Sequence, residues 1–129
     1  MQATANLPAT LAGCRVLVVE DEYFIADDIT RALRKLGAEV IGPLPSREEA
    51  LDVFSSEERI DAAVLDINLR GDVIYPLADA LRERGVPFVF ATGYDAGSIP
   101  EAYRGVARWE KPFDPHALVA AIPGLARAR

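Results

Sequence analysis

The chain has 129 residues, of which 50% are hydrophobic, and its formal net charge at pH 7 is -6. This length suits one globular domain with one hydrophobic core and leaves no room for a second. The acidic charge argues against nucleic acid as a direct partner, because Lys and Arg contacts with phosphates supply most non-specific affinity. The single cysteine, Cys14, has no partner for an internal disulfide, so the default expectation is a cytoplasmic location.

The start of the chain predicts an N-terminal tail. Residues 1–13 lack the basic start and the sustained apolar stretch of a signal peptide. No later segment approaches the length that spans a bilayer, so we also expect no membrane partner. The sequence therefore divides into a loose tail at 1–13 and a single domain at 14–129.

The domain alternates between two hydrophobic periods, which is typical of βα units wrapped around a parallel sheet. Several short segments are continuously apolar, as strands covered on both faces are, and the last is polar enough to lie at an edge. The expected strands are 15–19, 38–42, 61–66, 87–92 and 107–110. The pattern predicts an α/β fold built on a parallel sheet.

Apolar residues at helical spacing predict helices between the first four strands. One stripe runs from Ile25 to Leu36 and stops at Gly37, a residue suited to the turn after a helix. Another runs from Ile74 to Leu81. Between them, Ser46 and Glu49 have the spacing of a capping box at the start of a helix.

The last part of the chain is less regular. The segment 93–106 has too many Gly and Pro residues for a long helix, so we expect at most a short helical turn in a mobile loop. Asp114 and Pro115 read as the cap and first position of a final helix. Pro123 and Gly124 are expected to end or kink that helix early. The fourth and fifth helices should therefore be short.

Polar side chains stand at the carboxyl ends of the predicted strands. Parallel strands with right-handed crossovers bring those ends to one rim, where open α/β sheets place their sites. Glu20 and Asp21 follow the first strand, Asp66 ends the third, Thr92 ends the fourth and Lys111 follows the fifth. Glu22 is expected to belong to the start of the first helix, where a negative charge favours the helix dipole.

The chemistry open to this rim is narrow. Clustered carboxylates without His or Cys suit a hard cation such as Mg²⁺, with Mn²⁺ as an alternative. Asp66 is a carboxylate that could attack phosphorus to give an aspartyl phosphate. Such a transfer depends on positioning and charge neutralisation, so the cation, the Lys111 ammonium and the Thr92 hydroxyl would each hold one phosphoryl oxygen.

Four stretches, VLVVEDE, AVLDINL, FATGYD and EKPFD, resemble in this order the receiver domain of two-component response regulators. The resemblance covers residues 14 to about 122 and implies a flavodoxin-like (βα)5 fold, a doubly wound five-stranded parallel sheet. It implies that Asp66 takes a phosphoryl group from a histidine kinase. It also implies Asp21 as the direct Mg²⁺ ligand, Glu20 acting through water, and Asn68 binding the metal through its backbone carbonyl.

The family pattern also implies roles for the remaining rim residues and a mode of output. Thr92 matches the hydroxyl that follows the phosphoryl group, and Lys111 matches the ammonium that pairs with it. Such a domain is a phospho-acceptor rather than an enzyme, although self-phosphorylation from small donors and autodephosphorylation are expected. We expect phosphorylation to act through contact with a downstream protein, by ordering the loop 93–106, without an output domain of its own.

Some positions depart from the usual receiver pattern. Receivers commonly have Tyr or Phe three residues before the lysine, whereas this chain has Arg108. Tyr94 could replace that aromatic switch, although a tyrosine with no special role fits equally well. These departures, with GPLPSREEAL and PFVFATG, resemble the FAT GUY subgroup, whose members are often stand-alone or hybrid-kinase receivers linked to kinases of the HWE type.

Two other functions stay open. A pseudo-receiver that only binds a protein partner would not need the intact set of acids, threonine and lysine. A Mg²⁺-dependent hydrolase with Asp66 as nucleophile needs a second acid two residues on, where this chain has Asn68. In isolation, Asp66 could cap a turn, Thr92 could be an ordinary strand residue and Lys111 a surface lysine; His116 has no expected role.

Overall fold

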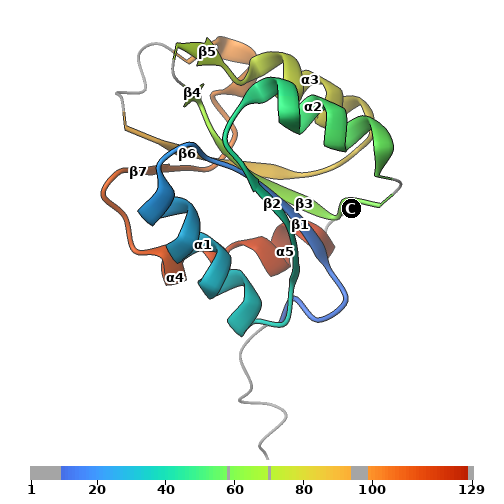
Figure 1. Ribbon diagram of the computed structural model, residues 1–129, viewed down its shortest axis with the longest axis vertical. Helices are drawn as coiled ribbons and strands as arrows, with labels where there is room; N and C mark the ends of the chain where they lie inside the picture. The colour runs from blue at the N-terminus through green and yellow to red at the C-terminus, as the bar shows by residue number, and fades with distance from the viewer. Residues whose placement is uncertain (1–9, 58, 70, 94–98, 128–129) are drawn as a thin grey trace, which may run out of the picture.

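The computed structural model describes residues 10–57, 59–69, 71–93 and 99–127, and helices cover both faces of a five-stranded parallel sheet in it (Figure 1). The strands follow the order β2-β1-β3-β6-β7, which is the flavodoxin-like order of a doubly wound sheet. They are β1 (Arg15–Val19), β2 (Glu39–Leu44), β3 (Ala62–Asp66), β6 (Phe88–Thr92) and β7 (Arg108–Glu110). The predicted fold class is confirmed, and each predicted strand matches an observed one to within two residues at either end.

The sheet separates two hydrophobic cores. Helices α1 (Tyr23–Lys35), α4 (Pro115–Ala120) and α5 (Ile122–Arg127) cover one face, while α2 (Arg47–Ser56) and α3 (Tyr75–Glu83) cover the other (Figure 1). Side chains alternate along each strand, so Val18 faces α1 and its neighbour Val19 faces α2 and α3. Across the described ranges, no helix has both the length and the apolar character of a membrane span.

The predicted helix starts are confirmed by their caps. Ser46 precedes α2, and its Oγ accepts a hydrogen bond from the Glu49 N–H at 3.1 Å, as the capping box requires. Asp114 precedes α4, and its Oδ1 accepts from the His116 N–H at 3.0 Å. These bonds satisfy N–H groups that have no partner inside the helix.

The last helix is short and broken, as predicted. The helix breaks at Ala121, before the proline, and helical structure resumes as α5 with Pro123 in its first turn. A proline is compatible with that position, because the first N–H groups of a helix make no internal hydrogen bond. The final helical segment is therefore interrupted just before Pro123, and helical structure continues through Pro123 and Gly124 in α5. The fourth crossover contains a short 3₁₀ helix, η3 (Glu101–Tyr103), as expected for 93–106, although residues 94–98 lie outside the described part of the chain.

The tail joins the domain earlier than the sequence suggests. Residues 1–9 lie outside the described part of the chain, but Leu11 is fully buried in the core that α1 covers. The Leu11 N–H donates to the Leu36 carbonyl at 2.8 Å, and the Thr10 hydroxyl donates to the same oxygen at 2.8 Å. This corrects the assignment of Thr10 to Gly13 to a loose tail, because an apolar side chain here gains by burial.

A small antiparallel hairpin follows Asp66 that the sequence did not suggest. It pairs β4 (Asn68–Leu69) with β5 (Asp72–Val73), and Gly71 has φ +93° in the turn. That backbone conformation favours glycine, which has no Cβ to clash. Arg47 of α2 donates from Nη1 to the Val73 carbonyl at 2.9 Å and ties the hairpin to the α2 side of the sheet.

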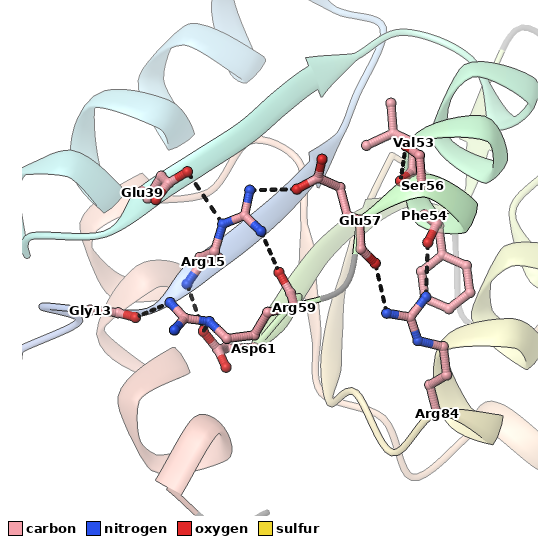
Figure 2. A network of polar contacts seen from close by, with 10 residues as sticks. All are labelled: Gly13, Arg15, Glu39, Val53, Phe54, Ser56, Glu57, Arg59, Asp61 and Arg84. Atoms are coloured by element: carbon pink, nitrogen blue, oxygen red, sulfur yellow. Dashed lines mark hydrogen bonds and ion pairs between the residues drawn. The ribbon is translucent and has the colours of Figure 1, made fainter.

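At the amino end of the sheet, charged side chains form a network of ion pairs and hydrogen bonds (Figure 2). We call it the amino-end network, and its charged members are Arg15, Glu39, Glu57, Arg59, Asp61 and Arg84. Arg15 of β1 pairs with Glu39 of β2 and with Glu57, the residue after α2. The network therefore connects strands and helices at the end of the sheet opposite Asp66.

Candidate functional site

The carboxyl ends of β1, β3 and β6 bring three buried polar side chains to one rim. Asp66 is the last residue of β3 and Thr92 the last of β6, while Glu20 directly follows β1. The relative exposure of the three residues is 3% for Glu20, 4% for Asp66 and 2% for Thr92. Burial of two carboxyl groups side by side is costly unless a cation neutralises them.

Lys111 supplies one such cation. Its Nζ lies 3.0 Å from Glu20 Oε1 and 3.1 Å from Asp66 Oδ2, so it bridges the two buried carboxylates. Lys111 directly follows β7, and its backbone N–H donates to the Thr92 carbonyl at 2.8 Å. The hydrogen bond of the β6–β7 pair therefore fixes the lysine beside Thr92, and the predicted rim residues come together.

Glu22 has a different role from the one the sequence suggested. It is the cap residue of α1, but its side chain makes no capping hydrogen bond within the described part of the chain. Instead, Glu22 Oε1 accepts from Lys111 Nζ at 2.9 Å. The helix dipole alone therefore does not explain Glu22, which is a third carboxylate on the same ammonium.

The acids also satisfy the requirements of a metal site. Ligand oxygens of Glu20, Asp21 and Asp66 all lie within 4.8 Å of one another. Glu20 Oε1 is buried and accepts no hydrogen bond from the described residues, despite the nearby ammonium. A buried anionic oxygen with spare acceptor capacity, in an all-oxygen donor set, suits a hard cation such as Mg²⁺.

These groups open into a cavity of about 370 Å³, which we call the acceptor cavity. The described residues that line it are Asp21, Glu22, Asp66, Asn68, Gly71, Gly93 and Lys111. Asn68 lies at the start of the hairpin; its N–H donates to Asp66 Oδ1 at 3.1 Å, and its side-chain oxygen accepts from the Gly71 N–H at 3.1 Å. The side-chain oxygen of Asn68 thus holds the turn of the hairpin.

The electrostatics of the site favour binding of a cation. Burial, followed by repulsion from Asp66, raises the pKa of Glu20 from 4.5 to about 7. Burial also raises the pKa of Asp66, although the charge of Lys111 opposes that shift. For Lys111, burial acts to lower the pKa, but the hydrogen bond that it donates to Glu22 and the charges of Asp66 and Glu20 outweigh burial and raise the pKa. The ammonium is charged, and the carboxylates still carry excess negative charge.

The position of the usual aromatic switch holds a partly buried arginine. Arg108 of β7 pairs in register with Phe90 of β6, two residues before Thr92. Tyr94, the candidate replacement, lies outside the described part of the chain. Trp109 is half-buried against the core under α1 and contributes packing there.

Comparison with known proteins identifies several relatives. No family model matches the chain. The regulator PhyR of Methylorubrum extorquens, named as phyllosphere-induced, is 32% identical over 127 residues, which cover 94% of this chain and 46% of PhyR. This chain spans about half the length of the curated relatives that it matches, with 49%, 46% and 54% of the first three covered.

Three solved structures match over nearly their full length. The solution structure of SdrG from Sphingomonas melonis Fr1 is 34% identical with a TM-score of 0.76, and the match covers 94% of this chain and 99% of SdrG. A BeF₃-activated conformation of SdrG, from Pseudomonas melonis Fr1, is 37% identical with a TM-score of 0.69. The match covers 86% of this chain and 98% of that SdrG chain. A response regulator receiver protein of Sinorhizobium medicae is 25% identical with a TM-score of 0.76. The match covers 92% of this chain and 98% of that protein.

Proposed function

We propose that this chain, which belongs to the receiver-domain family of response regulators, accepts a phosphoryl group on Asp66 from a histidine kinase. The observation that carries the proposal is the pairing of Asp66 with Lys111, at 3.1 Å, in a cavity that Asp21 and Asn68 also line. That cavity offers a nucleophile, a fixed positive charge and ligands for a metal. Phosphoryl transfer needs these parts and little else.

The chemistry of the transfer follows from the positions of the side chains. A carboxylate oxygen of Asp66 attacks phosphorus, an O–P bond forms and the N–P bond to the donor histidine breaks. The bonding electrons leave with the histidine nitrogen, whose ring departs neutral if its other nitrogen carries a proton. Lys111 donates to one phosphoryl oxygen and the Thr92 hydroxyl to another, which neutralises charge as the bond changes.

Mg²⁺ completes the site in this proposal. Asp21 and Asp66 would hold it directly, Glu20 through water and Asn68 through its backbone carbonyl; Mn²⁺ could replace it. When bound, the metal supplies positive charge toward a phosphoryl oxygen and toward the crowded carboxylates. Glu20 Oε1, which lies beside the ammonium but accepts no hydrogen bond from the described residues, supports this assignment.

The test is a mass measurement after incubation with Mg²⁺ and acetyl phosphate. We expect a gain of one phosphoryl group that Asp66→Asn and removal of Mg²⁺ each abolish. Asp79→Asn, which changes an exposed aspartate of α3, is the matched control and should label like the wild type. A folded wild type that never gains the group would instead indicate a pseudo-receiver, and continuous release of phosphate from an ester would indicate a hydrolase.

We further propose that the donor is a kinase of the HWE type and that the phosphorylated domain signals by contact with a downstream protein, in the cytoplasm. The FATG stretch at Phe90 to Gly93, shared with the FAT GUY subgroup, supports the choice of kinase. SdrG, which has a BeF₃-activated conformation, supports activation by a phosphoryl mimic. Transfer from a labelled HWE-type kinase should be faster than transfer from kinases of other types at equal concentration, and equal rates would contradict the assignment.

A further inference from the structure

Glu22 lies where two cavities meet. It lines the acceptor cavity and also a neighbouring cavity of about 490 Å³, which extends along the start of α1 to Asp28 and Phe113. Its backbone is held in place, because the Glu22 N–H donates to Glu20 Oε2 at 3.0 Å. The Glu22 side chain is 59% exposed, whereas that of Lys111 is 11% exposed. A carboxylate in water thus reaches into the site to contact a nearly buried ammonium.

The hydrogen bonds of Lys111 leave no room for a further acceptor. A lysine ammonium has three protons and donates three hydrogen bonds. Lys111 Nζ donates hydrogen bonds to Glu20 Oε2 at 3.1 Å, Asp66 Oδ2 at 3.1 Å and Glu22 Oε1 at 2.9 Å. While Asp66 is still an ionised carboxylate, a phosphoryl oxygen of an incoming donor can therefore bond Lys111 only if one of these carboxylates releases its hydrogen bond.

The three carboxylates differ in the cost of release. The side chains of Glu20 and Asp66 are 1% and 5% exposed, so loss of the ammonium would leave a buried charge unpaired. Glu22 is largely in water, and its hydrogen bond to Lys111 can be exchanged for hydrogen bonds to solvent at little cost. Glu22 is thus the carboxylate that a phosphoryl group would displace.

We propose that Glu22 is a positioning residue. Before transfer, it accepts the hydrogen bond from Lys111 that a phosphoryl oxygen would otherwise accept, and it therefore competes with the phosphoryl group for this bond. Glu22 then lowers the affinity of the site for any phosphoryl group or mimic. Its negative charge at the cavity wall also opposes entry of small anionic donors, more strongly for a dianion than for a monoanion. Unassisted phosphorylation is slowed in this way, and a donor that brings its own compensating contacts is favoured.

The first experiment measures adduct formation and therefore rests on the proposed function. It compares the wild type, Glu22→Gln and Asp28→Asn with Mg²⁺ in excess. Initial rates of adduct formation are measured by mass for acetyl phosphate, a dianion near neutral pH, and for phosphoramidate, which carries less negative charge. We expect Glu22→Gln to raise the acetyl phosphate rate by roughly threefold to tenfold, as one close charge in water would. The phosphoramidate rate should rise less, and added salt should reduce the difference between the two donors.

Asp28→Asn is the matched control, because Asp28 is an exposed acid of the same helix that lines the neighbouring cavity. Its effect should stay below twofold if contact with Lys111 is what matters. A Glu22→Gln rate equal to or below that of the wild type overturns the proposal, and so does an equal gain from Asp28→Asn.

A second measurement separates this inference from the proposed function. The Mg²⁺-dependent affinity for BeF₃⁻, a phosphoryl mimic that needs no transfer, is titrated calorimetrically for the same proteins. Tighter binding by Glu22→Gln supports the inference even if no covalent adduct ever forms, in which case only the proposed function fails. Equal affinity, or no binding by either protein, overturns the inference.

Discussion

The two ends of the sheet handle charge in opposite ways. At the carboxyl end, the ammonium of Lys111 faces three carboxylates, and a fourth, Asp21, lies close to two of them. At the amino end, acids and guanidinium groups alternate in a network (Figure 2), and the guanidinium groups also bond to backbone carbonyls. One end carries excess negative charge, and the other is balanced.

The balanced end ties elements together. Arg84, the residue after α3, donates from Nη1 to the Phe54 carbonyl at 2.8 Å and from Nη2 to the Glu57 carbonyl at 2.9 Å. These carbonyls lie at the end of α2, where a helix has acceptors without internal partners. The Arg84 guanidinium also lies over the Phe54 ring at 4.1 Å. Here charges join parts of the fold, whereas at the carboxyl end three carboxylates share one ammonium beside a cavity.

We expect Lys111→Met to destabilise the protein more than the other substitutions. This change removes the one ammonium from the buried carboxylates, and loss of one partner from a buried charge cluster costs about 3 kcal/mol of unfolding free energy. Urea unfolding at pH 8 in the presence of a chelator measures the loss. The loss of unfolding free energy should be smaller near pH 5, where Glu20 is protonated and carries no charge, and Mg²⁺ should restore part of the lost stability.

Lys35→Met, which alters an exposed lysine at the end of α1, is the control and should change stability by less than about 0.5 kcal/mol. A loss from Lys111→Met no greater than this would contradict the account of the carboxyl end.

We expect Glu20→Gln to stabilise the metal-free protein. The pKa of Glu20 is raised from 4.5 to about 7, so folding favours the protonated acid. That contribution is fully present below about pH 4.5 and is lost as the pH rises through about 7. A neutral glutamine does not lose it, and one pKa unit corresponds to about 1.4 kcal/mol. After allowance for solvent screening and the weaker bond to Lys111, we expect a gain of about 2 kcal/mol at pH 8.

The measurement is a pair of thermal unfolding series from pH 4.5 to pH 8 with a chelator present. The wild type and Glu20→Gln should agree at the acid end and diverge toward pH 8, and added Mg²⁺ should stabilise the wild type more than the variant. Parallel curves across the range would show that Glu20 does not titrate in this window.

Arg84→Met should have the smallest effect of the three. It removes two hydrogen bonds to the end of α2 but keeps apolar contact with Phe54, so we expect a loss of about 1 kcal/mol. The loss should be the same at pH 5 and pH 8, with or without Mg²⁺, because guanidinium groups do not titrate in this range. Urea unfolding under the four conditions checks this, and a Mg²⁺-dependent loss would indicate coupling between the two ends.

Much of the fold could be predicted because its signals are local and periodic. The apolar runs of β1, β3 and β6 and the stripe of α1 depend only on neighbouring residues. The topology of a parallel sheet then brings Asp66, Thr92 and Lys111 to one rim, without knowledge of any side-chain conformation.

The parts that were missed depend on contacts that no periodicity carries. Strands β4 and β5 have two residues each, too few for an alternation to show. Leu11 is buried because a hydrogen bond to Leu36 places it against α1, a partner distant in sequence. The contact between Glu22 and Lys111 depends on side-chain direction at a helix start. The only signal for it was the third acid in VEDE, which the helix dipole also explains.

The backbone hydrogen bond from Lys111 to Thr92 has a mechanical consequence. Because this bond continues the β6–β7 pairing, the backbones of Thr92 and Lys111 are held together. Only Pro112, Phe113 and Asp114 separate Lys111 from α4, which packs against α1. A displacement of the Thr92 backbone would therefore also move the backbone of Lys111, three residues before the cap of α4, so the helical face that α4 shares with α1 lies one short segment away from the rim.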